Sequence, residues 1–181
     1  MQSNKTRSEP LRLFFALWPD RQVVDGLRRV ALAQHAECGG RVMRAETLHI
    51  TLLFLGAVQA DRIRALKAAA AQVSFGAFSF YLSQFECWRH NRIGFVSGTA
   101  EETAQLSQLA GMLRQAVADA GFSFDQRGFV PHVTVLRKIE QVMRRGIQPP
   151  LEWRVRDFAL VSSEKTEEGI RYRTLASWPL S

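Results

Sequence analysis

The chain has 181 residues, of which 46% are hydrophobic and 23% are charged. These values suit one globular domain, or two small lobes around a shared core. No run of about 18 apolar residues is present, so we expect no membrane span. Residues 1–9 are polar and predict a flexible tail, followed by a single domain at residues 10–181. Cys38 and Cys87 lack CxxC spacing, which fits free thiols in the reducing cytoplasm.

The formal net charge is +7, and the basic residues are mostly arginine. The planar guanidinium fork binds phosphate well, so this composition favours a polyanionic partner such as nucleic acid. A merely basic surface explains the same charge, and composition leaves both interpretations open.

Apolar periodicity predicts helices and strands that alternate along the chain. We expect strands at residues 11–17, 41–44, 48–55, 78–88, 93–98, 130–136, 154–163 and 170–178. We expect helices at residues 20–36, 61–73, 101–120 (the longest) and 140–148. Asp20 is the predicted cap of the first helix, Gly39 and Gly40 end it, and Gly56 closes the third strand. Hairpins mixed with helices indicate an α+β fold with substantially antiparallel sheet.

One four-residue pattern occurs twice, as His-Ile-Thr-Leu at residues 49–52 and as His-Val-Thr-Val at residues 132–135. Side chains alternate between the two faces of a strand, so His and Thr share one face while the aliphatic residues anchor the other. The two copies lie 83 residues apart, which indicates a duplicated plan in which each half contributes one such strand. Two facing strands of this kind would form a cleft with two imidazoles and two hydroxyls.

This equipment suits acid–base chemistry on a phosphodiester. One imidazole can take a proton from the attacking water while the other protonates the departing oxygen. The hydroxyls of Thr51 and Thr134 can hold the non-bridging phosphate oxygens. A His-x-Thr in a strand is usually structural, but its repetition on two apolar strands favours function. Two histidines without carboxylate or thiolate partners make a poor zinc site, so we expect no metal.

The sequence around both motifs resembles the two-histidine (2H) phosphoesterase superfamily, in particular its RNA 2′,3′-cyclic phosphodiesterase branch, often labelled 2′-5′ RNA ligase. The matching segments cover most of the chain in order: LRLFFALWPD, ETLHITLLFLG, FVPHVTVLRK and RVRDFALVSSEKTEEGIRYRTLASWPL. The resemblance implies a bilobal α+β fold, with two antiparallel sheets facing across a central cleft, helices packed outside and a pseudo-twofold plan.

The resemblance also implies an activity: hydrolysis of an RNA terminal 2′,3′-cyclic phosphate to a 2′-phosphomonoester, without a metal or other cofactor. By position in the family, His49 would be the proton donor and His132 the proton acceptor. Thr51, Thr134 and Arg137 would bind the phosphate. The same chemistry in reverse would join RNA ends through a 2′-5′ linkage. The implied partner is RNA with a cyclic phosphate end, tRNA fragments being one candidate, and the implied protein is a cytoplasmic monomer.

Three further side chains are candidates for substrate contact. Phe129 precedes the second motif and can stack a nucleobase, although a core role explains it equally well. Arg44 and Arg127 lie just upstream of the two motif strands, where they would rim the cleft. Two alternative functions also remain open at this stage. One is a phosphodiesterase acting on a small cyclic nucleotide, and the other is a non-catalytic module that binds RNA ends.

Overall fold

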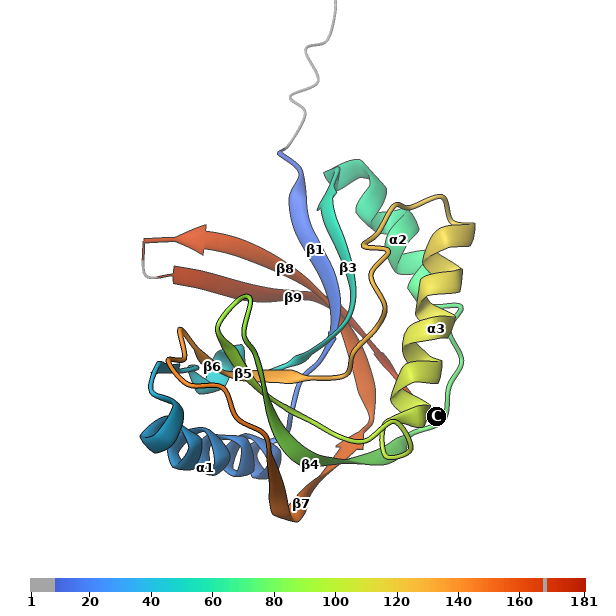
Figure 1. Ribbon diagram of the computed structural model, residues 1–181. Helices are drawn as coiled ribbons and strands as arrows, with labels where there is room; N and C mark the ends of the chain where they lie inside the picture. The colour runs from blue at the N-terminus through green and yellow to red at the C-terminus, as the bar shows by residue number, and fades with distance from the viewer. Residues whose placement is uncertain (1–8, 168) are drawn as a thin grey trace, which may run out of the picture.

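The computed structural model describes residues 9–167 and 169–181, which form nine strands, three α-helices and two short 3-10 helices (Figure 1). Except for Glu9, the predicted flexible tail lies outside these described residues. The elements are β1 (Leu11–Leu17), α1 (Arg21–Cys38), β2 (Arg41–Val42), η1 (Ala45–Thr47), β3 (Ile50–Val58), η2 (Ala60–Arg62), α2 (Ile63–Ala70), β4 (Phe78–Trp88), β5 (Ile93–Ser97), α3 (Ala104–Asp119), β6 (Val133–Arg137), β7 (Arg145–Val155), β8 (Asp157–Thr166) and β9 (Gly169–Pro179).

The strands form one antiparallel sheet in the order β7-β4-β5-β6-β3-β1-β8-β9, with β2 paired to β6. The sheet has two halves that meet where β3 pairs with β6, and this join consists of the single residue pair Ile50–Val133. The predicted α+β class with an antiparallel sheet is therefore confirmed. The two expected sheets are the two halves of a continuous one.

The halves follow a common plan around that join. In one half, β1 and β3 are antiparallel neighbours joined through α1, and in the other half β5 and β6 are antiparallel neighbours joined through α3. Helix α1 packs on β6 and β7 of the opposite half, whereas α3 packs against α2 and β3. Figure 1 shows α1 and the α2–α3 pair well apart on the molecule. This arrangement brings the two motif strands to the centre of the sheet.

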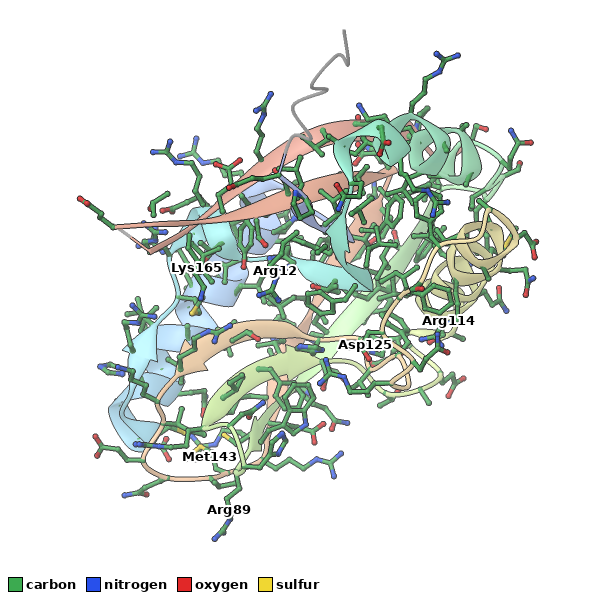
Figure 2. All side chains as sticks on the ribbon, turned by 90° about the horizontal axis from the view of Figure 1, so that it is seen from above. Arg12, Arg89, Arg114, Asp125, Met143 and Lys165 are labelled. Atoms are coloured by element: carbon green, nitrogen blue, oxygen red, sulfur yellow. The ribbon has the colours of Figure 1, made fainter. Side chains whose placement is uncertain are left out.

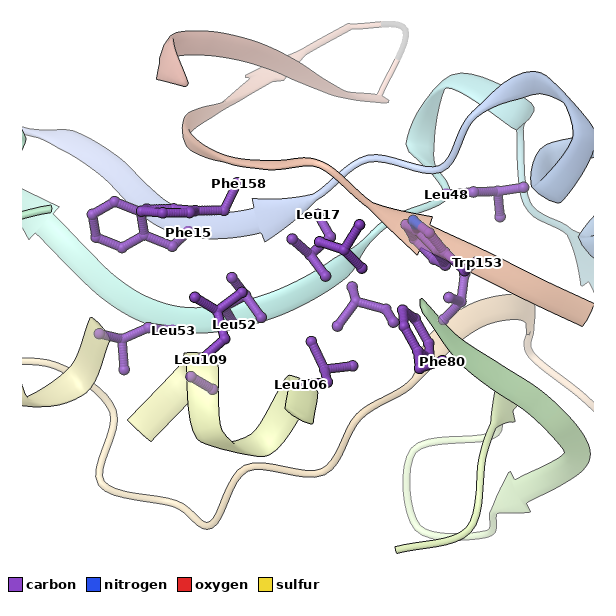
Figure 3. Close-up of a cluster of buried hydrophobic side chains, with 14 of the residues drawn as sticks. Phe15, Leu17, Leu48, Leu52, Leu53, Phe80, Leu106, Leu109, Trp153 and Phe158 are labelled. Atoms are coloured by element: carbon purple, nitrogen blue, oxygen red, sulfur yellow. The ribbon is translucent and has the colours of Figure 1, made fainter. Parts of the chain in front are cut away.

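From Leu13 to Leu17, strand β1 is buried on both faces, which explains the apolar run LFFAL. Leu13, Phe15 and Leu17 enter the main core, part of which is shown in Figure 3. Phe14 and Ala16 point to the other face, where they join Ala159 and Val161 in a second, smaller cluster. Trp18 and Tyr172 pack against this smaller cluster, which supports the site described below.

The predicted start and end of the first helix are confirmed. The Asp20 carboxylate accepts a hydrogen bond from the Val23 backbone N–H at 2.9 Å, the usual geometry of an N-cap. Gly39 ends α1 with a φ of 64°, a backbone conformation that favours glycine. None of the helices in the described residues is long and apolar enough to cross a membrane.

Several boundaries differ from the sequence prediction. The helix expected at residues 140–148 is wrong, because that segment is irregular up to Arg144 and then enters β7. The backbone N–H groups of Glu140 and Gln141 donate to the Cys38 carbonyl, which ties the segment to the end of α1. The 18 residues of α1 also make it longer than α3, which has 16. Gly56 lies inside β3 and does not close it.

Candidate active site

The two motifs lie at the join between the halves of the sheet. Ile50 and Val133, the bridging pair, are completely buried. Side chains alternate along a strand, so the residues on either side of this pair project to the opposite face. His49, Thr51, His132 and Thr134 all line one cleft on that face. The predicted phase of both motifs is confirmed, with each histidine lying immediately before its strand begins.

Both imidazoles are oriented by the same backbone contact. His49 Nδ1 lies 2.8 Å from the Thr47 carbonyl oxygen, and His132 Nδ1 lies 2.7 Å from the Val130 carbonyl oxygen. A carbonyl oxygen only accepts, so each Nδ1 carries the hydrogen and each Nε2 is left with a lone pair. His49 Nε2 lies 3.1 Å from Thr51 Oγ1, close enough to accept the hydroxyl proton. Both Nε2 atoms are therefore available for proton transfer.

Aromatic rings surround His49 on several sides. Its ring centroid lies 5.2 Å from that of Phe14, 5.4 Å from Trp18 and 5.1 Å from Tyr172. Tyr172 meets it edge-on, at an interplanar angle of 76°. These rings belong to the smaller apolar cluster, and their packing restricts the orientation of the imidazole.

Aromatic rings from the other half of the sheet also pack against His132, but they are fewer. Trp88 at the end of β4 lies edge-on at 4.6 Å between ring centroids, and Phe95 of β5 lies at 5.7 Å. Trp88 and Phe95 are themselves in contact, 4.3 Å apart. The two histidines are thus equivalent in sequence pattern but not in environment.

Burial disfavours the charged form of both imidazoles. The pKa of His49 is lowered to about 4, chiefly by burial; the Thr47 carbonyl opposes this shift, and the charges of His132 and Arg137 add to it. Burial also lowers the pKa of His132. Both side chains are therefore mainly neutral near pH 7 in the free protein.

The cleft has a volume of about 650 Å³ and is lined by residues from both halves. Beside the four motif residues, the lining includes Arg137 at the end of β6 and five further charged side chains, namely Arg12, Asp125, Arg127, Glu164 and Lys165. Figure 2, seen from above, labels Arg12 and Lys165 on one part of the molecule and Asp125 on another. The space is large enough for a nucleotide-sized ligand.

The structure brings some of the other predicted site residues to the cleft and leaves others outside it. Arg137 and Arg127 line the cleft. Arg44 lines an adjoining cavity of about 260 Å³, where it donates to the Ile170 carbonyl at 3.2 Å and pairs with Glu46 at 3.3 Å. Phe129 packs against the main core, as in the alternative interpretation of the sequence.

The aromatic neighbours of the histidines were not identified from the sequence. The run LFFAL indicates that Phe14 and Phe15 face opposite sides, but not which one reaches the cleft. Tyr172 and Trp88 reach the histidines through long-range strand order, which no local pattern reveals. In the described residues, no group of three or more His, Cys, Asp or Glu side chains is placed to hold a metal ion.

Residues 17–95 and 98–172 match the sequence profile of the family described as LigT like phosphoesterase. The chain belongs to the LigT-like phosphoesterase family. This confirms the resemblance to two-histidine phosphoesterases and the prediction that the protein is a phosphodiesterase-type enzyme.

Two named relatives are similar over three quarters or more of the chain. A protein of Escherichia coli K12 named RNA 2′,3′-cyclic phosphodiesterase is 32% identical over 177 residues, which cover 96% of this chain and 99% of that protein. A Thermotoga maritima protein of the same name is 30% identical over 148 residues, or 76% of this chain and 78% of that protein. The apo structure of E. coli LigT superposes with a TM-score of 0.81, at 32% identity and with 96% and 99% coverage.

Proposed function

We propose that this protein hydrolyses the 2′,3′-cyclic phosphate at an RNA end to a 2′-phosphomonoester. The observation that carries the proposal is the pair of imidazoles with unprotonated Nε2 atoms in one cleft, together with two threonines and Arg137. The names of the related proteins from E. coli and T. maritima support this substrate. E. coli LigT has also been crystallised with 3′-AMP, and that structure has a TM-score of 0.80 to this chain.

The reaction needs one proton acceptor and one proton donor. In our proposal, His132 takes a proton from water as the water oxygen attacks phosphorus. The bond between phosphorus and O3′ then breaks, and His49 gives its proton to O3′, leaving a 2′-phosphate and a 3′-hydroxyl. Thr51, Thr134 and Arg137 hold the non-bridging oxygens and stabilise the charge that develops on them.

The lowered pKa values bear on this division of labour. A neutral His132 is ready to accept a proton, whereas a donor must first be protonated. The negative phosphate of the substrate favours the imidazolium form of a neighbouring histidine, so substrate binding raises the pKa of His49 toward the working pH. The donor role is thus assigned in the presence of bound phosphate.

The test is hydrolysis of an RNA oligomer that ends in a 2′,3′-cyclic phosphate, assayed in EDTA with product mapping. We expect a 2′-phosphate product from the natural protein. Each of the substitutions His49→Ala and His132→Ala is expected to lower kcat by at least about 100-fold, because general acid and base steps contribute about 10² to 10⁴-fold each. His90→Ala, at an exposed histidine in the turn after β4, is the matched control.

Full activity in either cleft variant would rule out the two-histidine mechanism. A 3′-phosphate product would mean that O2′ leaves, and loss of activity in EDTA that a metal restores would overturn the metal-free proposal. The protein's own RNA substrates, with tRNA fragments as one candidate, can then be compared on the same assay.

We infer further that residues 10–181 act as one domain. The continuous main core, which draws side chains from both halves of the sheet, supports this. A monomer in the cytoplasm remains our prediction, and the free thiols of Cys38 and Cys87 agree with a reducing compartment. Formation of 2′-5′ linkages by the same site is the proposed side reaction.

A further inference from the structure

The cationic side chains of the cleft differ in whether a carboxylate neutralises them. The Arg127 guanidinium donates to both oxygens of Asp125, with Nε at 3.0 and 2.9 Å. Within the described residues, Arg12, Arg137 and Lys165 form no ion pair. The remaining cleft carboxylate is Glu164, next to Lys165 in sequence. Three positive charges thus face this space without a paired carboxylate, and Arg137 alone belongs to the proposed site of the scissile phosphate.

Arg12 and Lys165 lie diagonally to one another on adjacent strands. Arg12 of β1 is opposite Ser163 of β8, and Lys165 is two residues beyond Ser163 on the same face. Arg12 also shares a face with Phe14, two residues or about 6.7 Å along β1. Because the Phe14 ring contacts His49, Arg12 lies one side-chain step farther from the histidines than Phe14 does, and Lys165 lies two steps farther.

The space between the histidines and these cations has an aromatic wall. Phe14 and Phe54 are neighbours across β1 and β3, with ring centroids 5.8 Å apart, and both line the cleft. Phe54 is 44% exposed although it is large and apolar. An exposed ring beside a phosphate site offers a surface on which a nucleobase or ribose can lie.

Building on the proposed function, we propose that Arg12 and Lys165 form a second phosphate subsite. This subsite binds the phosphate ester on O5′ of the terminal nucleoside, while the cyclic phosphate lies between His49 and His132. In an RNA chain that group is the last internucleotide phosphate, and the nucleoside crosses the wall of Phe14 and Phe54. Arg127 contributes less, because Asp125 already satisfies it.

The chemistry of this subsite separates substrates by their 5′ side. A nucleoside 2′,3′-cyclic phosphate with a free 5′-hydroxyl leaves Arg12 and Lys165 without a partner. A dinucleotide ending in a cyclic phosphate fills both sites. The advantage of the dinucleotide depends on charge, so it shrinks as salt concentration rises.

The experiment compares three substrates: adenosine 2′,3′-cyclic phosphate, the same compound with a 5′-phosphate, and a diadenosine dinucleotide ending in the cyclic phosphate. We expect the natural protein to have a higher kcat/KM for the dinucleotide than for the 5′-hydroxyl compound. Arg12→Ala and Lys165→Ala should each reduce kcat/KM for the dinucleotide by about tenfold, the size of one charge-assisted hydrogen bond at a partly exposed site. Neither should change kcat/KM for the 5′-hydroxyl compound, and Arg12→Lys should restore part of the loss.

Two arginine variants serve as controls. Arg29→Ala removes an exposed charge from α1, and Arg171→Ala removes one that lines the adjoining cavity beside Arg44. The assignment is overturned if Arg12→Ala and Lys165→Ala lose kcat/KM equally on all three substrates or lose none on any. It is also overturned if Arg171→Ala loses kcat/KM selectively on the dinucleotide. If only the 5′-phosphorylated mononucleotide has a higher kcat/KM than the 5′-hydroxyl compound, the subsite stands, but its ligand is a small nucleotide and not RNA.

A binding measurement separates this proposal from the activity. Calorimetric titration with 3′-AMP and with adenosine 3′,5′-bisphosphate needs no turnover. The bisphosphate should bind about tenfold more tightly to the natural protein, and this difference should vanish in Arg12→Ala. If no cyclic phosphate is hydrolysed, the proposed function fails, while equal affinities for the two nucleotides would reject the subsite itself.

Discussion

The two histidines of the cleft have identical sequence patterns and different surroundings. Three aromatic rings and the Thr51 hydroxyl contact His49, whereas two rings contact His132. Each Nδ1–H is held by the carbonyl two residues upstream, so orientation does not distinguish the two side chains. Their roles as donor and acceptor must therefore be separated by an experiment on the chemical step.

A substrate whose leaving group needs no proton provides that separation. In the 3′-thio analogue of the cyclic phosphate, sulfur replaces the leaving oxygen and departs readily as a thiolate, because a thiol has an ordinary pKa of about 8.5. If His49 is the donor, His49→Ala should lose about tenfold or less on the analogue but at least about 100-fold on the normal substrate. His132→Ala should lose equally on both. The opposite pattern in single-turnover assays would exchange the two roles.

For single residues, the sequence predicts what the alternation of side chains along a strand determines. The shared face of His49 and Thr51, and the buried position of Ile50, follow from a period of two. Tyr172 and Trp88 could not be assigned to the cleft, because each reaches a histidine through strands that are distant in sequence. Phe129 is close to His132 in sequence and was a candidate for stacking a nucleobase, yet it packs against the main core.

Among the elements, β3 shows how one glycine changes a boundary. The register of β1 and β3 shifts between the pairs Leu13–Gly56 and Phe14–Phe54, so one extra residue is accommodated in β3. Gly56 has a φ of 71°, a region that other residues enter at a cost. This bulge lets β3 continue to Val58. A second shift, between the pairs Phe15–Leu53 and Ala16–Thr51, lets Thr51 and Phe54, three residues apart, both face the cleft.

Replacing this glycine should therefore destabilise the protein. Gly56→Ala is expected to lower the free energy of unfolding by about 1 kcal/mol through backbone strain alone, since no atom lies within 4 Å of the added methyl position. Gly76 is equally open but has no positive φ, so Gly76→Ala should be neutral or stabilise by about 0.5 kcal/mol. Urea denaturation of both variants checks the contrast, and equal effects would mean that the bulge carries no strain.

The segment before β7 shows the opposite limit of sequence reasoning. Residues 140–148 have helical spacing, but the chain there is tied to the end of α1 and then becomes an edge strand that contains Pro149 and Pro150. An edge strand tolerates proline because its outer N–H groups need no partner in the sheet. Long-range hydrogen bonds and the position of β7 at the edge of the sheet determine the conformation of this segment. A local sequence pattern reveals neither of them.

For the molecule as a whole, one join serves both stability and activity. The buried Ile50–Val133 pair links the two halves of the sheet, and the histidines project from its other face. Placing both imidazoles there requires removing them from water, and this removal lowers both pKa values. The proposed site therefore makes the fold sensitive to acid.

The sign of this effect follows from proton binding. An unfolded chain has a histidine pKa of about 6.5, whereas His49 in the folded protein has a pKa of about 4. Between these two pKa values the unfolded chain binds more protons than the folded protein does. The titration of His49 therefore leaves the free energy of unfolding unchanged above about pH 6.5 and decreases it as the pH falls toward 4. The loss amounts to about 3 kcal/mol, and His132 adds to it in the same direction.

His49→Asn should remove most of this dependence. Between pH 7 and pH 4, the natural protein is expected to lose about 3 kcal/mol more unfolding free energy than the variant, because the carboxylates titrate alike in both. His90→Asn, at an exposed histidine, should keep the natural slope. Saturating inorganic phosphate should reduce the acid loss in the natural protein, since an anion in the cleft stabilises the imidazolium. Identical slopes for the natural protein and His49→Asn in urea denaturation would show that desolvation of His49 does not control acid stability.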